Sequence, residues 1–155
     1  MGLDISAYKN VRIVECDEPE YRFYNQGWKQ SNMPHIDNKE IQIEFDEQFD
    51  FRAGSYGSYN VFRNIISETI HGISAEMFWK MSDKEMENKA FRWLIDFSDC
   101  EGYIGTDYCE ILYNDFKEHG NKIKEACDND TYKNLVDKWT HAFDIARNKG
   151  LVSFH

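Results

Sequence analysis

The chain has 155 residues, of which 41% are hydrophobic and 15% aromatic, so it is long enough to bury a core built on Phe, Tyr and Trp side chains. Its 28 acidic side chains outnumber the 18 basic ones, and the resulting net charge of -10 repels nucleic-acid phosphates and anionic membranes. We therefore expect no nucleic-acid partner and no membrane partner, and no segment approaches the ~20 apolar residues of a membrane span.

The first third of the chain has the character of β-structure. Residues 11–14 are a short strand candidate, and residues 41–45 alternate apolar and polar side chains at the period that buries one face of a strand. Between them, residues 17–38 are polar and aromatic and contain both prolines. This composition predicts a long irregular connection.

The rest of the chain has helical periodicity. Ser58 is the expected N-cap of a first helix that Gly72 ends, and Ser82 with Glu85 matches the capping box of a second helix that extends to about residue 95. Thr106 is the expected cap of a third helix, and a fourth follows position 130 with an apolar stripe formed by Leu135, Val136, Trp139, Ala142, Phe143 and Ala146.

The end of the chain is expected to return to the sheet. Lys149 and Gly150 provide a basic last turn and a stop signal for the fourth helix, and residues 151–155 form a short apolar segment typical of a strand. The patterns together predict a single α+β domain over residues 1–155. Its small, mainly antiparallel sheet comes from the N-terminal third and the C-terminal segment and is covered on one face by about four helices.

One segment, residues 51–63, favours an anion. It carries Arg52 and Arg63 but no acidic residue, and its glycines let backbone amides approach a ligand. The positive end of the following helix adds to the attraction. The alternative is a simple turn in which tyrosines fill the core and the two arginines pair with surplus acids.

A second segment, residues 94–106, is the most informative part of the chain, because it combines ionisable side chains with glycines between two helical stretches. Its carboxylates, with one more just beyond, could hold Mg²⁺ or Ca²⁺: Asp96, Asp99, Glu101 and Asp107. Their spacing does not match the calcium-binding loop, so we predict no metal site there. The alternative is structural, with Asp99 capping a turn and Cys100 buried.

The cysteines and histidines have no recognised catalytic spacing. The four cysteines form no C-x-x-C pair, and the N-terminus lacks a signal peptide, which predicts reduced, non-catalytic thiols in the cytoplasm. No two of the five histidines stand four residues apart, so a helical zinc-protease motif is excluded. The strand expected at the C-terminus would fix His155 against the domain.

Five blocks of the sequence carry a resemblance: GLDI at 2–5 with AY at 7–8, FRAGSY at 51–56 with YN at 59–60 and Arg63, FSDCEG at 97–102 with IG at 104–105, Trp139 with AF at 142–143, and FH at 154–155. With these blocks the chain resembles a family of short uncharacterised proteins from bacteria and their phages. It differs where Asp96 stands in place of an expected asparagine and Phe62 in place of a tryptophan. The resemblance implies a phage or prophage origin and favours a host interaction, but it implies no activity.

The sequence favours a small binding protein in which the two segments converge on a small polar, nucleotide-like ligand. The expected ligand-binding residues are Arg52, Ser55, Tyr56, Tyr59, Asn60, Arg63, Ser98, Asp99, Glu101 and His155. One alternative is an acidic interaction protein that inhibits a host or defence factor. Another is a small metal-dependent hydrolase that uses Asp99 and Glu101 as metal ligands or general base, with His155 as a further candidate. The sequence specifies no cofactor, no catalytic residue and no oligomeric state.

Overall fold

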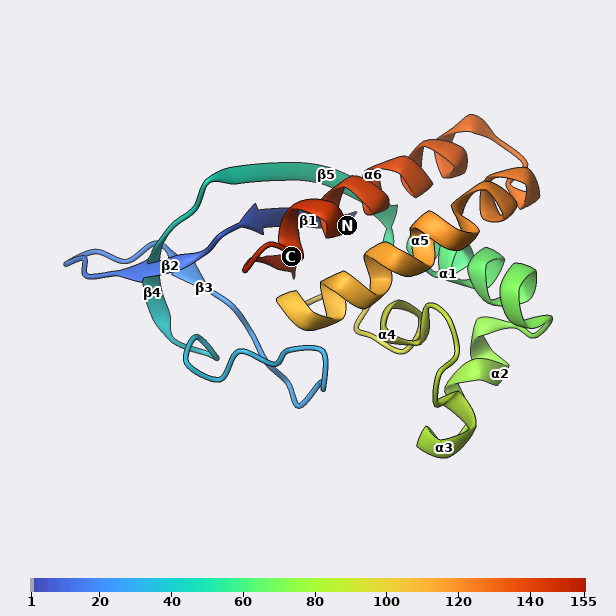
Figure 1. Ribbon diagram of the computed structural model, residues 1–155, viewed down its shortest axis with the longest axis horizontal. Helices are drawn as coiled ribbons and strands as arrows, with labels where there is room; N and C mark the ends of the chain where they lie inside the picture. Colours follow the sequence, from blue (N-terminus) through green and yellow to red (C-terminus); the bar gives the residue numbers. More distant parts are fainter. Residues whose placement is uncertain (1) are drawn as a thin grey trace.

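The central sheet of the computed structural model, which describes residues 2–155, has four strands in the order β5-β1-β7-β6 (Figure 1). All neighbouring strands are antiparallel. The strands are β1 (Gly2–Lys9), β5 (Glu47–Ser55), β6 (Gly102–Gly105) and β7 (Leu151–Phe154). The C-terminal strand is therefore confirmed, and it occupies an inner position. The strand β6 was not expected from the sequence.

A second, smaller sheet has the order β2-β4-β3, with β2 (Arg12–Val14), β3 (Tyr21–Arg22) and β4 (Glu40–Glu44). It confirms the two strands predicted around residues 11–14 and 41–45, and Ile41 and Ile43 are buried on one face as the alternation requires. The connection at 17–38 is irregular apart from β3 and a single bridge between Phe23 and Asp37. It nevertheless packs against the domain and buries Phe23 and Ile36.

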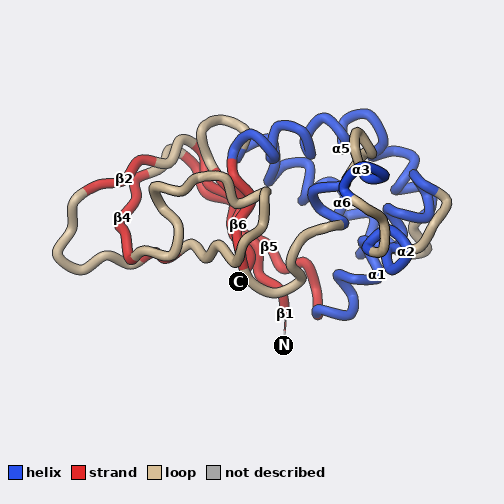
Figure 2. The backbone as a smooth tube through the Cα atoms, turned by 90° about the horizontal axis from the view of Figure 1, so that it is seen from below, coloured by secondary structure: helices blue, strands red, loops and turns tan. Residues whose placement is uncertain are grey.

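Six helices follow the N-terminal strands. Three long helices pack on one face of the central sheet: α1 (Tyr56–His71), α5 (Thr106–Ala126) and α6 (Asp130–Ala146). Three short helices connect α1 to β6: α2 (Ala75–Trp79), α3 (Asp83–Met86) and α4 (Arg92–Ile95). The second sheet lies at the opposite end of the molecule from α2 and α3 (Figures 1 and 2). The architecture is the predicted α+β class with more, and shorter, helices than expected.

Side-chain alternation in the central sheet divides the core. On the helix side, Leu3 and Ile5 of β1 join the main cluster of buried side chains with Phe154 of β7 and Trp139 of α6. On the other side, Tyr8, Tyr103 and Leu151 form a second cluster beneath the segment that carries the small sheet. This segment covers only part of that face, so Asp4, Ser6 and His155 line a pocket at one end of the sheet, where Ser6 is 5% exposed.

Two predicted helix caps were wrong. Ser55, not Ser58, caps α1, because its extended backbone lets Oγ accept the Ser58 N–H at 3.0 Å. Thr106 is the first residue of α5 rather than its cap, and its hydroxyl donates to the Ala146 carbonyl at 2.9 Å. The predicted stop at Gly72 is confirmed, since this residue has a φ of 71° and closes α1.

The helix predicted from 83 to 95 is broken into α3 and α4. Ser82 caps α3 as expected, but Asn88 and Phe91 have left-handed backbones, with φ of 62° and 63°. The Phe91 N–H donates to Asp115 Oδ2 of α5 at 2.9 Å instead of to a helical carbonyl. A tertiary hydrogen bond thus overrides the local helical pattern.

The last helix and its exit follow the sequence closely. Every member of the predicted apolar stripe of α6 is buried. Gly150 then leads into β7 so close to β1 that an added Cβ would lie 1.7 Å from the Tyr8 carbonyl oxygen. Only glycine fits this crossing.

Candidate functional site

A pocket of about 390 Å³ lies where α1, the end of α2, the turn after α4 and the irregular connection meet. We call it the Trp pocket. Its lining residues are Trp28, Arg63, Trp79, Asp96, Phe97, Ser98 and Asp99. The volume is in the range of small-molecule sites, about 300–1,000 Å³.

Arg63 is only 3% exposed and forms the inner wall of the Trp pocket. One terminal nitrogen donates to the carbonyls of Ile95 at 3.0 Å and Phe97 at 2.6 Å, and the other donates to Asn60 Oδ1. Within residues 2–155 no carboxylate forms an ion pair with this guanidinium within 4.0 Å. Backbone carbonyls at the end of α4, which carry partial negative charge, compensate it instead.

Two indoles shape the pocket. The Trp79 ring lies against the guanidinium of Arg63, with the guanidinium carbon 5.1 Å from the ring centroid. Its Nε1 donates to the Ile95 carbonyl at 2.6 Å, yet the residue is 43% exposed. Trp28 approaches from the irregular connection and packs against Phe97 with 5.4 Å between ring centroids. Both indoles therefore contribute aromatic surface to the lining of the pocket.

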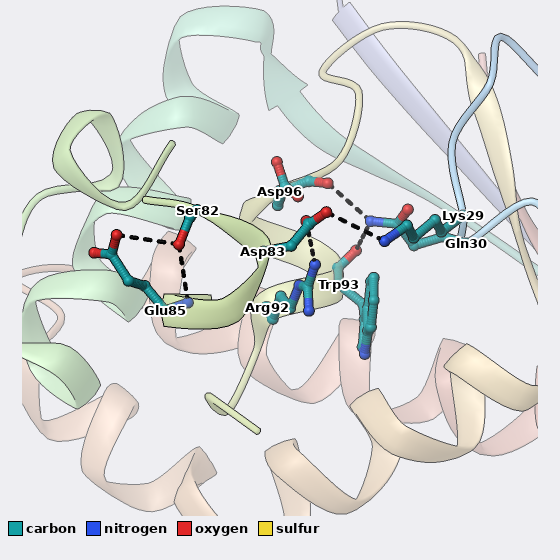
Figure 3. Close-up of polar contacts among 8 residues, drawn as sticks. All are labelled: Lys29, Gln30, Ser82, Asp83, Glu85, Arg92, Trp93 and Asp96. Atoms are coloured by element: carbon teal, nitrogen blue, oxygen red, sulfur yellow. Dashed lines mark hydrogen bonds and ion pairs between the residues drawn. The ribbon is translucent and has the colours of Figure 1, made fainter. Parts of the chain in front are cut away.

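The segment that carries Trp28 is fixed by polar contacts with α3 and α4 (Figure 3). Gln30 Nε2 donates to the main-chain carbonyls of Trp93 at 3.1 Å and Asp96 at 2.8 Å. Asp83 accepts from Arg92 at 2.7 Å and from Lys29 at 3.4 Å. These bonds hold the irregular connection as one wall of the pocket.

The two carboxylates of the pocket differ in their hydrogen-bond partners. Asp99 Oδ2 accepts from Asn60 Nδ2 at 3.1 Å. Asp96 is half-buried, and no hydrogen bond or ion pair from the described part of the chain reaches its carboxylate. Burial raises the pKa of Asp96, and the nearby positive charge of Arg92 opposes the shift. The pocket thus contains a partly desolvated acceptor without a partner.

Four of the expected ligand-binding residues meet at this pocket or directly behind it: Asn60, Arg63, Ser98 and Asp99. Ser98 forms the turn itself, because its Oγ accepts the N–H groups of Cys100 and Glu101, both at 3.2 Å. Tyr59 is fully buried with its ring 4.7 Å from the Arg63 guanidinium carbon, and burial raises the pKa of its hydroxyl to about 12. The two segments therefore touch as expected, through α1.

The other expected residues lie elsewhere, so the ten do not form one site. Arg52 is exposed on β5 and forms a two-pronged ion pair with Asp4, with both N···O distances 2.9 Å. His155 lies beside this pair and donates its N–H to the Asp4 carbonyl at 2.9 Å. Ser55 serves as the helix cap, and Tyr56 packs against the core. The two arginines separate because one belongs to a strand and the other to a helix.

Glu101 also lies outside the pocket, exposed and accepting from Gln26 Nε2 at 3.3 Å. The sequence analysis missed Trp28 and Trp79, which form the walls. Trp28 lies in the polar connection, where a lone tryptophan has no regular pattern to explain it. Such an unexplained aromatic residue was the available signal.

The remaining reactive groups of the described residues are not clustered. No group of three or more His, Cys, Asp or Glu side chains within residues 2–155 is placed to hold a metal ion. All four cysteines are free, and Cys100, expected to be buried, is exposed. None of the helices described is long and apolar enough to cross a membrane.

Comparison with known proteins yields no match to a family model, a curated protein or a solved structure.

Proposed function

We propose that the protein binds a small, flat ligand rich in N–H donors, of the nucleoside type, in the Trp pocket. The observation that carries the proposal is the half-buried carboxylate of Asp96, which has no partner and lies in a pocket with two indole walls. A half-buried carboxylate that only solvent reaches is partly desolvated, and a ligand donor would compensate for this partial desolvation.

The polar groups of the pocket select the kind of ligand. The terminal nitrogens of Arg63 are engaged by backbone carbonyls and by Asn60, so the guanidinium contributes a flat cationic surface rather than free terminal donors. The acceptors that remain free are the carboxylate oxygens of Asp96 and Oδ1 of Asp99, and the buried Nε of Arg63 is a donor without a partner. A heterocycle that stacks on an indole and presents adjacent N–H groups to a carboxylate, as guanine does, matches this arrangement.

The same carboxylates disfavour phosphate. Each would repel a phosphate charge at ~4 Å by about 1 kcal/mol even in water, and by more in a partly desolvated pocket. The proposal therefore refines the nucleotide-like ligand expected from the sequence to an uncharged nucleoside.

Guanosine, inosine, adenosine and guanosine monophosphate are the probes that test the proposal, by quenching of tryptophan fluorescence and by thermal shift. We expect guanosine to bind more tightly than inosine, which lacks the exocyclic amine, and more tightly than the monophosphate. Asp96→Asn should weaken guanosine binding about 10- to 100-fold, the loss typical of a charged hydrogen bond.

Glu101→Gln is the matched control, because it removes a carboxylate from the same segment but outside the pocket. It should bind as the parent protein does. If none of the four compounds quenches the fluorescence or raises the melting temperature, the proposal is refuted.

A further inference from the structure

A second set of polar side chains lies on the uncovered end of the central sheet, on the face opposite the long helices. The strand register places Asp4 opposite Arg52, and Ser6 between Asp50 of β5 and Ser153 of β7. These rows border a pocket of about 470 Å³ that shares no lining residue with the Trp pocket, and Ser6 and His155 are both part of its lining.

The side chains of Ser6 and His155 are hydrogen-bonded to each other. Ser6 Oγ lies 2.9 Å from His155 Nε2. The histidine is anchored by its backbone, because its N–H donates to the Asp4 carbonyl at 2.9 Å and its carbonyl accepts the Asp4 N–H at 2.8 Å. In the tautomer that carries the ring proton on Nδ1, Nε2 accepts the hydroxyl proton of Ser6. This is the geometry in which an imidazole activates a serine.

A second hydroxyl group lies beside Ser6 on the neighbouring strand. Ser153 is directly opposite Ser6 in the β1–β7 pair, and side chains in such positions have Cβ atoms about 4.5–5.5 Å apart on the same face. The Ser153 hydroxyl can therefore donate to an oxygen atom bound near Ser6 Oγ, where negative charge develops during acyl transfer.

The charges around the pair favour an uncharged substrate. Arg52 is neutralised by Asp4 through the two-pronged ion pair. Asp50, held by Gln48 at 3.0 and 3.1 Å, leaves one negative charge at the edge of the pocket. A substrate with a carboxylate or phosphate near the reacting carbon would be repelled.

We propose that Ser6 is a nucleophile and His155 its general base in the transfer or hydrolysis of uncharged carboxylic esters. Ser6 Oγ attacks the carbonyl carbon while its proton passes to His155 Nε2. The bond to the leaving alcohol then breaks, and the alkoxide takes the proton from Nε2. Water next attacks the acyl-serine and gives a proton to Nε2, the acid departs, and Ser6 Oγ recovers that proton.

Diisopropyl fluorophosphate tests the nucleophile, because it is uncharged and leaves a stable adduct on an activated serine. Ser6 Oγ displaces fluoride from phosphorus, and its proton passes through His155 to solvent. We expect a single diisopropylphosphoryl group, located on Ser6 by peptide mass mapping.

The variants separate catalysis from folding. Ser6→Ala should abolish the label, His155→Asn should slow it about a hundredfold or more, and Ser153→Ala should slow it at least about tenfold. Ser58→Ala is the matched control, because its hydroxyl faces Tyr132 at 3.3 Å rather than a histidine, and it should react as the parent does. Circular dichroism verifies that each variant is folded.

Absence of label on Ser6 in the folded parent protein, or an unchanged rate in His155→Asn, would overturn the proposal. Asp96→Asn provides the link to the Trp pocket. Because the two pockets share no lining residue, this variant should label normally whether or not it binds guanosine.

Discussion

Asp115 of α5 makes stability depend on pH, and one substitution can remove this dependence. Its Oδ2 accepts the Phe91 N–H at 2.9 Å, which helps to hold the left-handed residue that starts α4. Burial raises the pKa of Asp115 from 3.8 to about 6, although the Phe91 hydrogen bond and nearby His119 favour the charged form. Ionisation of this carboxyl therefore costs folding free energy.

The size of the effect follows from linkage. Between about pH 4 and about pH 6 the folded state retains a proton that the unfolded state has released, so the free energy of unfolding falls as pH rises. A shift of about two pKa units corresponds to at most about 3 kcal/mol. Because Asp115 is partly exposed, we expect about 2 kcal/mol after allowance for solvent screening.

Asp115→Asn keeps an acceptor for the Phe91 N–H and removes the titration. The variant should match the parent near pH 4 and be about 2 kcal/mol more stable near pH 7, which is about 4–8 °C in melting temperature for a chain of this size. Urea unfolding across this pH range measures the difference.

Glu125→Gln is the control, since it removes an exposed acid from the same helix and should retain the parent profile. The reasoning fails if the Asn variant loses stability between about pH 4 and about pH 6 as the parent does, or if it is less stable near pH 7.

Deleting residues 151–155 removes three buried apolar side chains of an inner strand, at about 1.5–3 kcal/mol each, and should lower the melting temperature by many degrees or unfold the protein. A truncated protein that melts like the parent would show that β7 adds nothing to stability. Iodoacetamide should modify exposed Cys16 and Cys100 well before buried Cys109 and Cys127, because burial raises the pKa of the latter two thiols. Mass spectrometry of timed samples measures the order, and equal rates at all four positions would contradict the described burial.

Local sequence patterns were sufficient to predict the buried positions of a helix or strand that packs one regular face against the core. The period of α6 identified its core positions, and the alternation at residues 41–45 identified the buried face of β4. The apolar tail after Gly150 identified β7, because an exposed segment of that composition would leave its side chains in water. These features depend only on neighbours in sequence.

Part of the candidate site was predictable for a similar reason. Asn60 and Arg63 lie one helical turn apart, and Ser98 and Asp99 are adjacent, so each pair keeps its local geometry in the fold. The sequence could not reveal that Trp28 forms a wall of the same pocket. Its position depends on the long-range bonds of Gln30 to the carbonyls of Trp93 and Asp96.

The sequence by itself determined the α+β class, the buried stripes and the net charge of -10, because these follow from composition and short periods. Only the tertiary structure decided that the Asp115 carboxylate interrupts the helix at Phe91 and that Arg52 pairs with Asp4, away from the pocket that Arg63 lines. It also decided that Ser6 contacts His155, which is 149 positions away in the sequence. Each of these outcomes is a hydrogen bond between groups far apart in the chain, and a pattern of neighbouring residues contains no information about such a partner.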